Sequence, residues 1–219
     1  MSSVATLQEV DVHAGHDVHH EHHHHETFIS KYVFSQDHKM IAKQFLITGM
    51  IWAIIGGLFS VIFRLQLGYP EQSFPFLEDF LGHWAKGGKL QPQFYYALVT
   101  MHGTILVFFV LTAGLSGTFA NFLIPLQIGA RDMASPLLNM LSYWFFFLAS
   151  VIMFSSLFVQ TGPASGGWTI YPPLSALPQA MPGSGMGMTL WLVSMSFFIV
   201  SSLMGGLNYV VTVINLRTK

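Results

Sequence analysis

A single histidine lies deep within an apolar stretch and is the first candidate for chemistry. His102, followed by Gly103, is the only ionisable side chain other than tyrosines between Pro92 and Pro125. In a helix over this stretch, His102 lies about ten residues, or roughly 15 Å, from the nearer end. An imidazole at that depth needs a partner, which makes it a candidate haem or metal ligand. The alternative is a neutral imidazole that hydrogen-bonds a neighbouring helix.

Two charged residues at the ends of apolar runs are further candidates. Arg64 closes the first run and is followed by Gln66. Its guanidinium either extends to a membrane surface or donates to an acidic or formyl group of a cofactor. Asp132 directly follows Arg131 in a short polar segment. One interpretation is a surface ion pair between the two residues. The other is that Asp132 collects protons at the mouth of a channel.

Amides and hydroxyls within the apolar runs give a weaker indication. A set of them could line a water path across one half of a helical bundle: Asn121, Asn139, Ser201, Ser202 and Asn208. Polar side chains at helix contacts are also common where they only hold helices together. Both interpretations remain open on the residues alone.

Residues 1–27 form a separate compositional region with eight of the eleven histidines, interspersed with Asp and Glu. This pattern indicates weak binding of Zn, Cu or Ni, a disordered tail, or an affinity tag. A tag is usually an unbroken run of histidines, so the interruptions favour a native disordered tail. We expect residues 1–36 to form a His-rich, disordered, cytoplasmic tail.

The elements that must position these residues are membrane helices. Hydrophobic residues make up 52% of the 219 residues, charged residues only 9%, and the mean hydropathy is +0.53. Soluble domains carry about 25% charged residues. The absence of Cys excludes disulfides and thiolate metal sites, and the net charge of −1 excludes a basic nucleic-acid footprint. The composition therefore predicts an integral membrane chain.

The few charges delimit four apolar spans, at about 42–66, 93–124, 137–160 and 188–215. Lys and Arg are biased toward one side of these spans. With the N-terminus inside, six cations are cytoplasmic, and only three are outside, namely Arg64, Lys86 and Lys89. We therefore expect an all-α, multi-pass protein with a cytoplasmic N-terminus.

Four stretches carry a resemblance to a known family. They are residues 100–104 (TMHGT), 120–133 (ANFLIPLQIGARDM), 167–174 (GWTIYPPL) and 201–208 (SSLMGGLN). In order and spacing, the segment from Asp37 to Asn215 resembles the N-terminal third of subunit I of the haem-copper cytochrome c oxidases.

The resemblance implies a role for each candidate. His102 matches an axial ligand of the low-spin haem, and Arg64 the arginine that hydrogen-bonds the formyl group of that haem. Tyr95 matches a tyrosine near a haem propionate, and Trp168 lies in a motif that packs by the propionates. Asp132 matches the entrance of the D proton channel. The polar residues that match its lining are Asn121, Asn139, Ser201, Ser202 and Asn208.

The sequence departs from the family at three positions. Arg131 stands where relatives often have proline, beside the expected channel entrance. Phe45 replaces a channel tyrosine of the first helix and cannot hydrogen-bond a water. Gln66 replaces an acidic residue that helps bind a cation in some relatives, so we do not carry that cation site over.

The family's subunit I has about twelve spans in a pseudo-threefold bundle, so the four spans here correspond to part of it. We expect low-spin haem a to be half-ligated by this segment, with the second haem and copper held only by the full subunit. The 219-residue segment alone should be inactive.

The resemblance implies a bacterial inner-membrane cytochrome c oxidase that reduces oxygen to water and pumps protons. Its expected partners are subunits II (with copper) and III, cytochrome c through subunit II, and a respiratory supercomplex. Alternatives are a quinol oxidase of the same superfamily, a stand-alone haem-binding electron carrier or assembly subunit, and an interaction protein whose His-rich tail carries metal.

Overall fold

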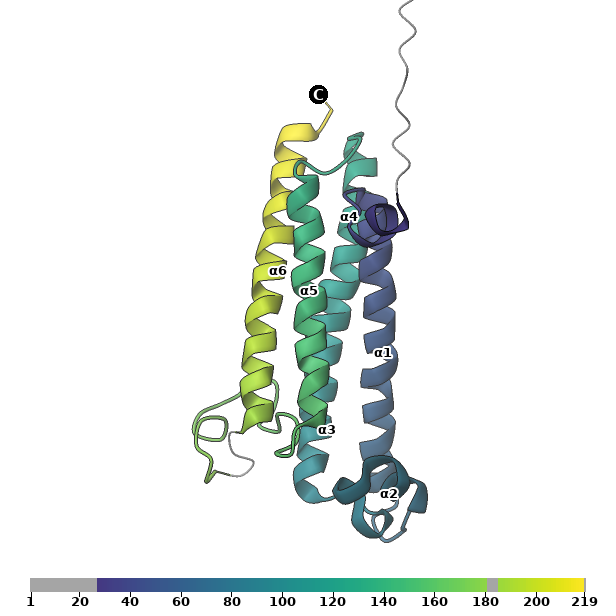
Figure 1. Ribbon diagram of the computed structural model, residues 1–219, viewed down its shortest axis with the longest axis vertical. Helices are drawn as coiled ribbons and strands as arrows, with labels where there is room; N and C mark the ends of the chain where they lie inside the picture. Colours follow the sequence, from purple (N-terminus) through teal and green to yellow (C-terminus); the bar gives the residue numbers. More distant parts are fainter. Residues whose placement is uncertain (1–26, 181–184, 219) are drawn as a thin grey trace, which may run out of the picture.

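The computed structural model describes residues 27–180 and 185–218, which form helices and no strand. Four helices are long and apolar enough to cross a membrane: His38–Gly68, Pro92–Ile128, Pro136–Phe158 and Met186–Leu216. They stand side by side as an elongated bundle (Figure 1). The expectation of an all-helical membrane chain with four spans is confirmed.

The first and third spans begin with side-chain caps. Asp37 precedes α1 (His38–Gly68), and its carboxylate accepts from the Met40 amide at 3.0 Å. Ser135 precedes α5 (Pro136–Ser155), and its hydroxyl accepts from the Leu138 amide at 3.4 Å. Such caps satisfy amides that have no partner within the helix. Both caps lie at the upper end of the bundle in Figure 1.

The second span is one continuous helix whose middle is more widely wound. It consists of α3 (Pro92–Thr104), the π-helical η3 (Ile105–Leu115) and α4 (Ser116–Ile128). A π-helical turn changes which residues share a face, and such segments are frequent at functional sites. The change of winding begins directly after Thr104, two residues beyond His102. The composition of this run does not reveal it.

Two glycines allow α1 to pack closely against this widened segment. A Cβ added to Gly49 would lie 2.9 Å from the Cα of Gly114. Real side chains do not tolerate that separation, so the two backbones meet only because neither residue carries a Cβ. The close contact fixes α1 against the second span near the middle of the bundle.

Aromatic side chains fill the centre between the four spans. Phe109 and Phe146 are fully buried, and their ring centroids lie 5.8 Å apart. Phe198 of α6 (Met186–Leu216) lies 5.7 Å from Phe109, and Phe45 of α1 lies 5.3 Å from Phe146. One residue from each span therefore meets at this centre, which holds the polar groups of each helix at a defined rotation.

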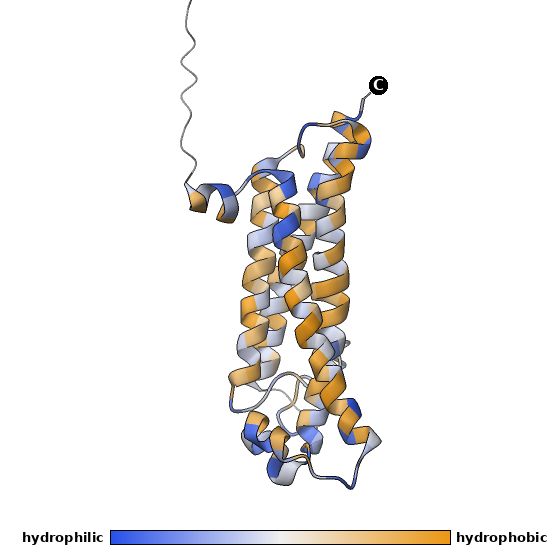
Figure 2. Cartoon of the chain, turned by 90° about the vertical axis from the view of Figure 1, so that its right-hand side faces the viewer, coloured by the Kyte–Doolittle hydropathy of each residue, from blue (hydrophilic) through white to orange (hydrophobic). Residues whose placement is uncertain are grey.

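The outer faces of the spans are apolar. Along α1, a stripe of side chains at helical spacing is more than half exposed: Ile47, Ile51, Ile54, Leu58 and Val61. Figure 2 shows that orange, hydrophobic residues dominate the middle of the bundle and blue residues gather at its ends. Exposed apolar surface of this extent suits lipid or further helices.

The two ends of the bundle differ. At the lower end in Figure 1, α2 (Pro75–Leu81) and η2 (Gly82–Gly88) link α1 to α3, and η4 (Ser156–Phe158) ends the third span. At the upper end lie η1 (Ile29–Val33), the α4–α5 loop and the end of α6. The His-rich residues 1–26 lie outside the described residues.

Part of the segment that we expected to be disordered is ordered. Two carbonyls in residues 27–36, those of Tyr32 and Val33, accept from the side-chain amide of Gln44 on α1 at 2.8 and 2.9 Å. Phe34 also stacks on Trp144 of α5, with ring centroids 4.9 Å apart. These contacts hold η1 and the following residues against the bundle, and composition alone does not indicate them.

Candidate functional site

The imidazole of His102 is held in one orientation by a backbone carbonyl. On α3, half-buried His102 places Nδ1 2.8 Å from the carbonyl oxygen of Gly56 on α1. A carbonyl only accepts, so this contact assigns the proton to Nδ1 and leaves the lone pair on Nε2 free. Metal-ligating histidines characteristically donate their second nitrogen in this way. The geometry thus suits an Nε2 ligand.

Aromatic rings surround His102 and come from three segments. The ring of Phe63 lies 5.5 Å from that of His102, and Tyr95 lies 6.0 Å from Phe63, edge to face in both cases. At the next residue of α3, a Cβ added to Gly103 would lie 3.5 Å from Cδ1 of Trp168. The structure therefore brings His102, Tyr95 and Trp168 into one neighbourhood.

The loop that carries Trp168 is attached to the second span. The Gly167 amide donates to the Thr100 hydroxyl at 2.9 Å, one residue from Trp168. Four residues further along the span, Thr104 accepts from the indole of Trp191 at 3.0 Å. Thr100 and Thr104 thus tie this loop and α6 to the helix that carries His102.

Arg64 does not join this group directly. It is exposed on α1, two turns beyond Gly56, and forms no ion pair with any described residue. Its guanidinium is therefore available to a group outside the described chain. The assignment of Arg64 to a cofactor remains a prediction.

The residues around His102 fit one face of a haem rather than a metal cage. Within residues 27–180 and 185–218, no group of three or more His, Asp or Glu side chains could hold a metal ion. A haem needs only one histidine on each face, and the orientation of His102 would suit one such ligand. Gly103, next to it, carries no side chain, and the ring of Trp168 lies 3.5 Å from the position that a Cβ would take.

Asp132 lies in the α4–α5 loop, half-buried at the upper end of the bundle. Its carboxylate accepts from the Met133 amide at 2.7 Å. Arg131 is exposed and does not pair with it; among the described residues, the one ion pair joins Lys89 and Glu71 at 3.8 Å, at the other end. The alternative of an Arg131–Asp132 surface pair is therefore not formed.

α6 fastens the loop that carries Asp132. The Asn208 Oδ1 accepts from the Ser135 amide at 2.9 Å, and its Nδ2 donates to the Ser135 carbonyl at 3.2 Å. The Thr212 hydroxyl accepts from the Ala134 amide at 2.9 Å. Asn208 and Thr212 stand one helical turn apart and grip consecutive loop residues, so Asn208 uses both ends of its amide within the protein.

Asn121 and Asn139 differ from Asn208 because part of each amide has no protein partner. Both are fully buried. The Oδ1 of Asn121 and both amide atoms of Asn139 lack hydrogen-bond partners among the described residues. Buried amides are normally satisfied, and ordered water commonly provides the partner where protein does not. These two side chains are therefore suited to hold water inside the bundle.

The two serines of α6 point in different directions. Ser201 is buried and donates to the Ser142 carbonyl of α5 at 2.6 Å. Ser202 is exposed on the outer face of the four-helix segment. The structure thus brings Ser201, but not Ser202, to the interior face that also carries Asn208. The place of Ser202 in a water path remains a prediction.

Three polar groups that contact Asn121 or Asn139 were not among the candidates from the sequence: buried His38 and Ser142 and half-buried Tyr209. Tyr209 accepts at its hydroxyl from Asn121 Nδ2 at 3.1 Å, and Ser142 donates to the Asn139 carbonyl at 2.7 Å. His38 places Nδ1 2.8 Å from the Asn121 carbonyl. That carbonyl is free because Pro125, four residues on, has no N–H to donate. The position of Pro125 is the one signal in the sequence that could have pointed to a partner there.

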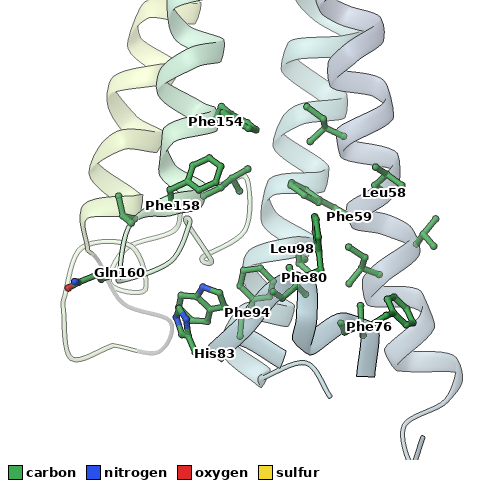
Figure 3. A pocket seen from close by; sticks show the side chains of 18 residues that line it. Leu58, Phe59, Phe76, Phe80, His83, Phe94, Leu98, Phe154, Phe158 and Gln160 are labelled. Carbon is green, nitrogen blue, oxygen red and sulfur yellow. The ribbon is translucent and has the colours of Figure 1, made fainter. Parts of the chain in front are cut away.

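A cavity of ≈ 930 Å³ opens at the lower end, between α1, α2, α3 and the end of α5. Its lining is almost entirely apolar, and Figure 3 shows Phe76, Phe80, Phe94 and Phe158 around it with His83 and Gln160 at the edge. Neither His102 nor the buried asparagines line this cavity. It is therefore separate from both groups of candidate residues.

Comparisons with known proteins agree with this architecture. The family model described as cytochrome c and quinol oxidase polypeptide I matches residues 40–219. The chain is 43% identical over 196 residues to alternative cytochrome c oxidase subunit 1 of Bradyrhizobium diazoefficiens, which covers 90% of the chain and 31% of that protein. Cytochrome c oxidase subunit 1 of a Synechocystis species is 36% identical over 189 residues, 86% of the chain and 30% of that protein.

A more distant relative is the haem-copper oxidase subunit I+III of Aeropyrum pernix. It is 33% identical over 191 residues, which cover 87% of the chain and 21% of that protein. The chain thus spans less than a third of the length of these curated relatives.

Proposed function

The chain belongs to the cytochrome c and quinol oxidase polypeptide I family, and we propose that it supplies one haem ligand and a proton entrance to a respiratory terminal oxidase. The whole enzyme oxidises cytochrome c, reduces oxygen to water and pumps protons. The observation that carries the proposal is the 2.8 Å contact between His102 Nδ1 and the Gly56 carbonyl. It leaves Nε2 free on a membrane-spanning helix.

The residues around His102 hold and tune the haem. His102 would hold the haem iron through Nε2, and the Gly56 carbonyl raises the basicity of its imidazole. Arg64 would donate to a polar substituent of the haem, and Tyr95 and Trp168 would contact its propionates. When bound, low-spin haem a supplies a one-electron carrier. The second haem and the copper belong to parts of the subunit beyond these residues.

The upper end of the bundle admits protons. Asp132 takes protons from the aqueous phase, and its loop is kept in place by Asn208 and Thr212. Inside the bundle, Asn139 and Asn121 hold water through their unpartnered amide atoms. Ser201 continues the path on the interior face of α6, and Ser202, on the outer face, lines it where further helices of the subunit cover that face. Protons then pass from one hydrogen-bonded water or hydroxyl group to the next. They do not have to enter the apolar aromatic centre of the bundle as isolated charges.

The orientation follows from the distribution of cations. The Lys31, Lys39 and Arg131 side chains belong to the same end of the bundle as Asp132. Lys and Arg accumulate on the cytoplasmic side of membrane proteins. We therefore place the N-terminus and Asp132 in the cytoplasm and the protein in the bacterial inner membrane, so that Asp132 takes up protons from inside the cell.

The relatives' names support cytochrome c as the electron donor. The Bradyrhizobium and Synechocystis proteins are both named as cytochrome c oxidase subunits. Subunit II with its copper passes electrons from cytochrome c, and subunit III completes the complex. The Aeropyrum relative is named as a fusion of subunits I and III, which supports a subunit III partner.

The purified membrane complex tests this proposal. With reduced cytochrome c, it should consume oxygen, contain haem and copper, and release protons on the outer side. If the complex oxidises quinol alone and lacks a copper-containing second subunit, then quinol, not cytochrome c, is the electron donor. Absence of oxygen consumption with either donor would contradict the assignment as a terminal oxidase.

A further inference from the structure

The side of α4 that carries Asn121 receives no hydroxyl from α1. Phe45 of α1 packs edge to face on Tyr143, with ring centroids 5.3 Å apart, and lies against Gly117. A Cβ added to Gly117 would come within 2.7 Å of Phe45 Cδ1. The phenyl ring therefore covers α4 one turn before Asn121, and a phenyl ring cannot hydrogen-bond water.

A hydroxyl reaches Asn121 from α6 instead. Tyr209 places its hydroxyl 3.1 Å from Asn121 Nδ2, and the same nitrogen donates to the Gly117 carbonyl at 2.6 Å. The two amide hydrogens are both used, so the amide plane of Asn121 is fixed. Its Oδ1 is then directed away from these two partners, where no described residue satisfies it.

The Tyr209 hydroxyl also lies beside Gly205, one turn earlier on α6. It accepts from Asn121, so its own hydrogen remains to donate. A Cβ added to Gly205 would lie 3.6 Å from the Tyr209 hydroxyl and 3.9 Å from Ser142 Oγ. Gly205 thus stands between two hydroxyls that come from α6 and α5, and its missing side chain leaves room beside both.

We propose that Tyr209 is a positioning residue of the proton path. Its hydroxyl fixes the Asn121 amide and donates to water in the gap at Gly205, which joins Asn121 to Ser142. The Ser142 hydroxyl donates to the Asn139 backbone carbonyl at 2.7 Å, and the Ser201 hydroxyl donates to the Ser142 backbone carbonyl at 2.6 Å, so these two hydroxyls lie next to the turn of α5 that carries Asn139. This inference rests on the proposed proton entrance at Asp132 and adds a hydroxyl from α6 where α1 has only Phe45.

Two substitutions in the purified oxidase complex test it. Tyr209→Phe removes only the hydroxyl, and Gly205→Ala fills the gap at ordinary van der Waals distances. Each should slow proton uptake, followed with a pH-indicator dye, about three- to tenfold, which is the effect of one hydrogen bond on a rate. Haem reduction by cytochrome c and the haem spectrum should not change, since neither residue lies near His102.

Matched controls separate this role from packing. Tyr143→Phe removes a buried hydroxyl that bonds Thr48 at 3.1 Å, and Gly206→Ala adds a methyl group with nothing within 4 Å. Both should take up protons at the native rate. Slowing by Gly206→Ala equal to that by Gly205→Ala would overturn the proposal, and so would a native rate in either test variant.

Asp132→Asn distinguishes a failure of the proposed proton entrance from a failure of the proposed role of Tyr209. If it slows uptake while Tyr209→Phe does not, the entrance holds and the role of Tyr209 is wrong. If Asp132→Asn itself takes up protons at the native rate, the proposed proton entrance fails, and the role of Tyr209 fails with it.

Discussion

The Nδ1 atom of His102 lies 2.8 Å from the carbonyl oxygen of Gly56, and this contact joins the first two spans at the candidate haem ligand. The carbonyl fixes both the tautomer and the rotation of the imidazole. The position of a haem bound at His102 would therefore depend on α1 as well as on α3, which carries His102. Two predictions follow from opposite sides of this contact.

Replacing the imidazole should remove the haem. His102→Ala deletes the one histidine of the second span, so the low-spin haem signal should disappear from the reduced-minus-oxidised spectrum of the full enzyme. His83→Gln is the control, because His83 lies at the edge of the lower cavity. An unchanged spectrum in His102→Ala would refute the ligand assignment.

Crowding the carbonyl should disturb the haem without removing its ligand. A Cβ at Gly56 would lie 3.0 Å from Leu106 Cδ2 and 3.1 Å from Ile105 Cγ2, so in Gly56→Ala these side chains must shift by a few tenths of an ångström beside the carbonyl. We expect a destabilisation of roughly 1–2 kcal/mol and a shifted haem band in thermal and spectral measurements. Gly57→Ala, with nothing within 4 Å of its Cβ, should alter neither. Equal effects of the two variants would argue against the contact.

Arg64 should act on the haem band through charge and hydrogen bonding alone. Its side chain is exposed and has no ionic partner among the described residues, so Arg64→Met should leave the fold intact. If the guanidinium donates to a formyl group, the absorption band of the haem should shift to shorter wavelength. Lys86→Met removes a cation elsewhere at the same end and should not shift it. A band that stays in place in Arg64→Met would exclude the formyl contact.

The four spans could be predicted because their signal is local. Between Lys89 and Arg217, Arg131 and Asp132 are the only charged side chains, so the ends of the helices can be read along the chain. The widened turn of η3 has no comparable signal along the chain; it lies in the segment where α1 packs closely on the second span at Gly49 and Gly114. Such a contact joins residues that lie far apart in the sequence, so reading one helix at a time does not reveal it.

The rotation of each helix about its axis also limits what the sequence can predict about the candidate site. Ser201 and Ser202 are neighbours of the same type, yet adjacent residues of a helix point about 100° apart, and one is buried while the other is exposed. Likewise, Asn139 and Asn208 are both buried asparagines, but only Asn208 meets the loop backbone. Such differences depend on side-chain partners from other helices, so the sequence indicates candidates and the fold separates their roles.

Removing the carboxylate at the upper end should separate pumping from haem content. Asp132→Asn keeps an acceptor for the Met133 amide, so the loop should stay folded. It loses the group that exchanges protons with the cytoplasm, and the pumped-proton to electron ratio should fall while the haem spectrum is retained. Asp79→Asn, an exposed carboxylate at the opposite end, is the matched control. A native proton ratio in Asp132→Asn would count against the entrance.

Asn208 should matter for the loop rather than as a holder of water. Asn208→Ala removes two hydrogen bonds to Ser135, which together are expected to stabilise the loop by about 1–3 kcal/mol. The Ser135 amide should therefore exchange with solvent faster in a hydrogen-exchange measurement. Ser196→Ala is the control on the same helix, because that exposed hydroxyl bonds only within α6, to the Leu192 carbonyl. If exchange at Ser135 is the same in the native protein and in Asn208→Ala, the amide does not hold the loop. The loss of proton uptake in such a variant would then have to come from water that Asn208 itself binds.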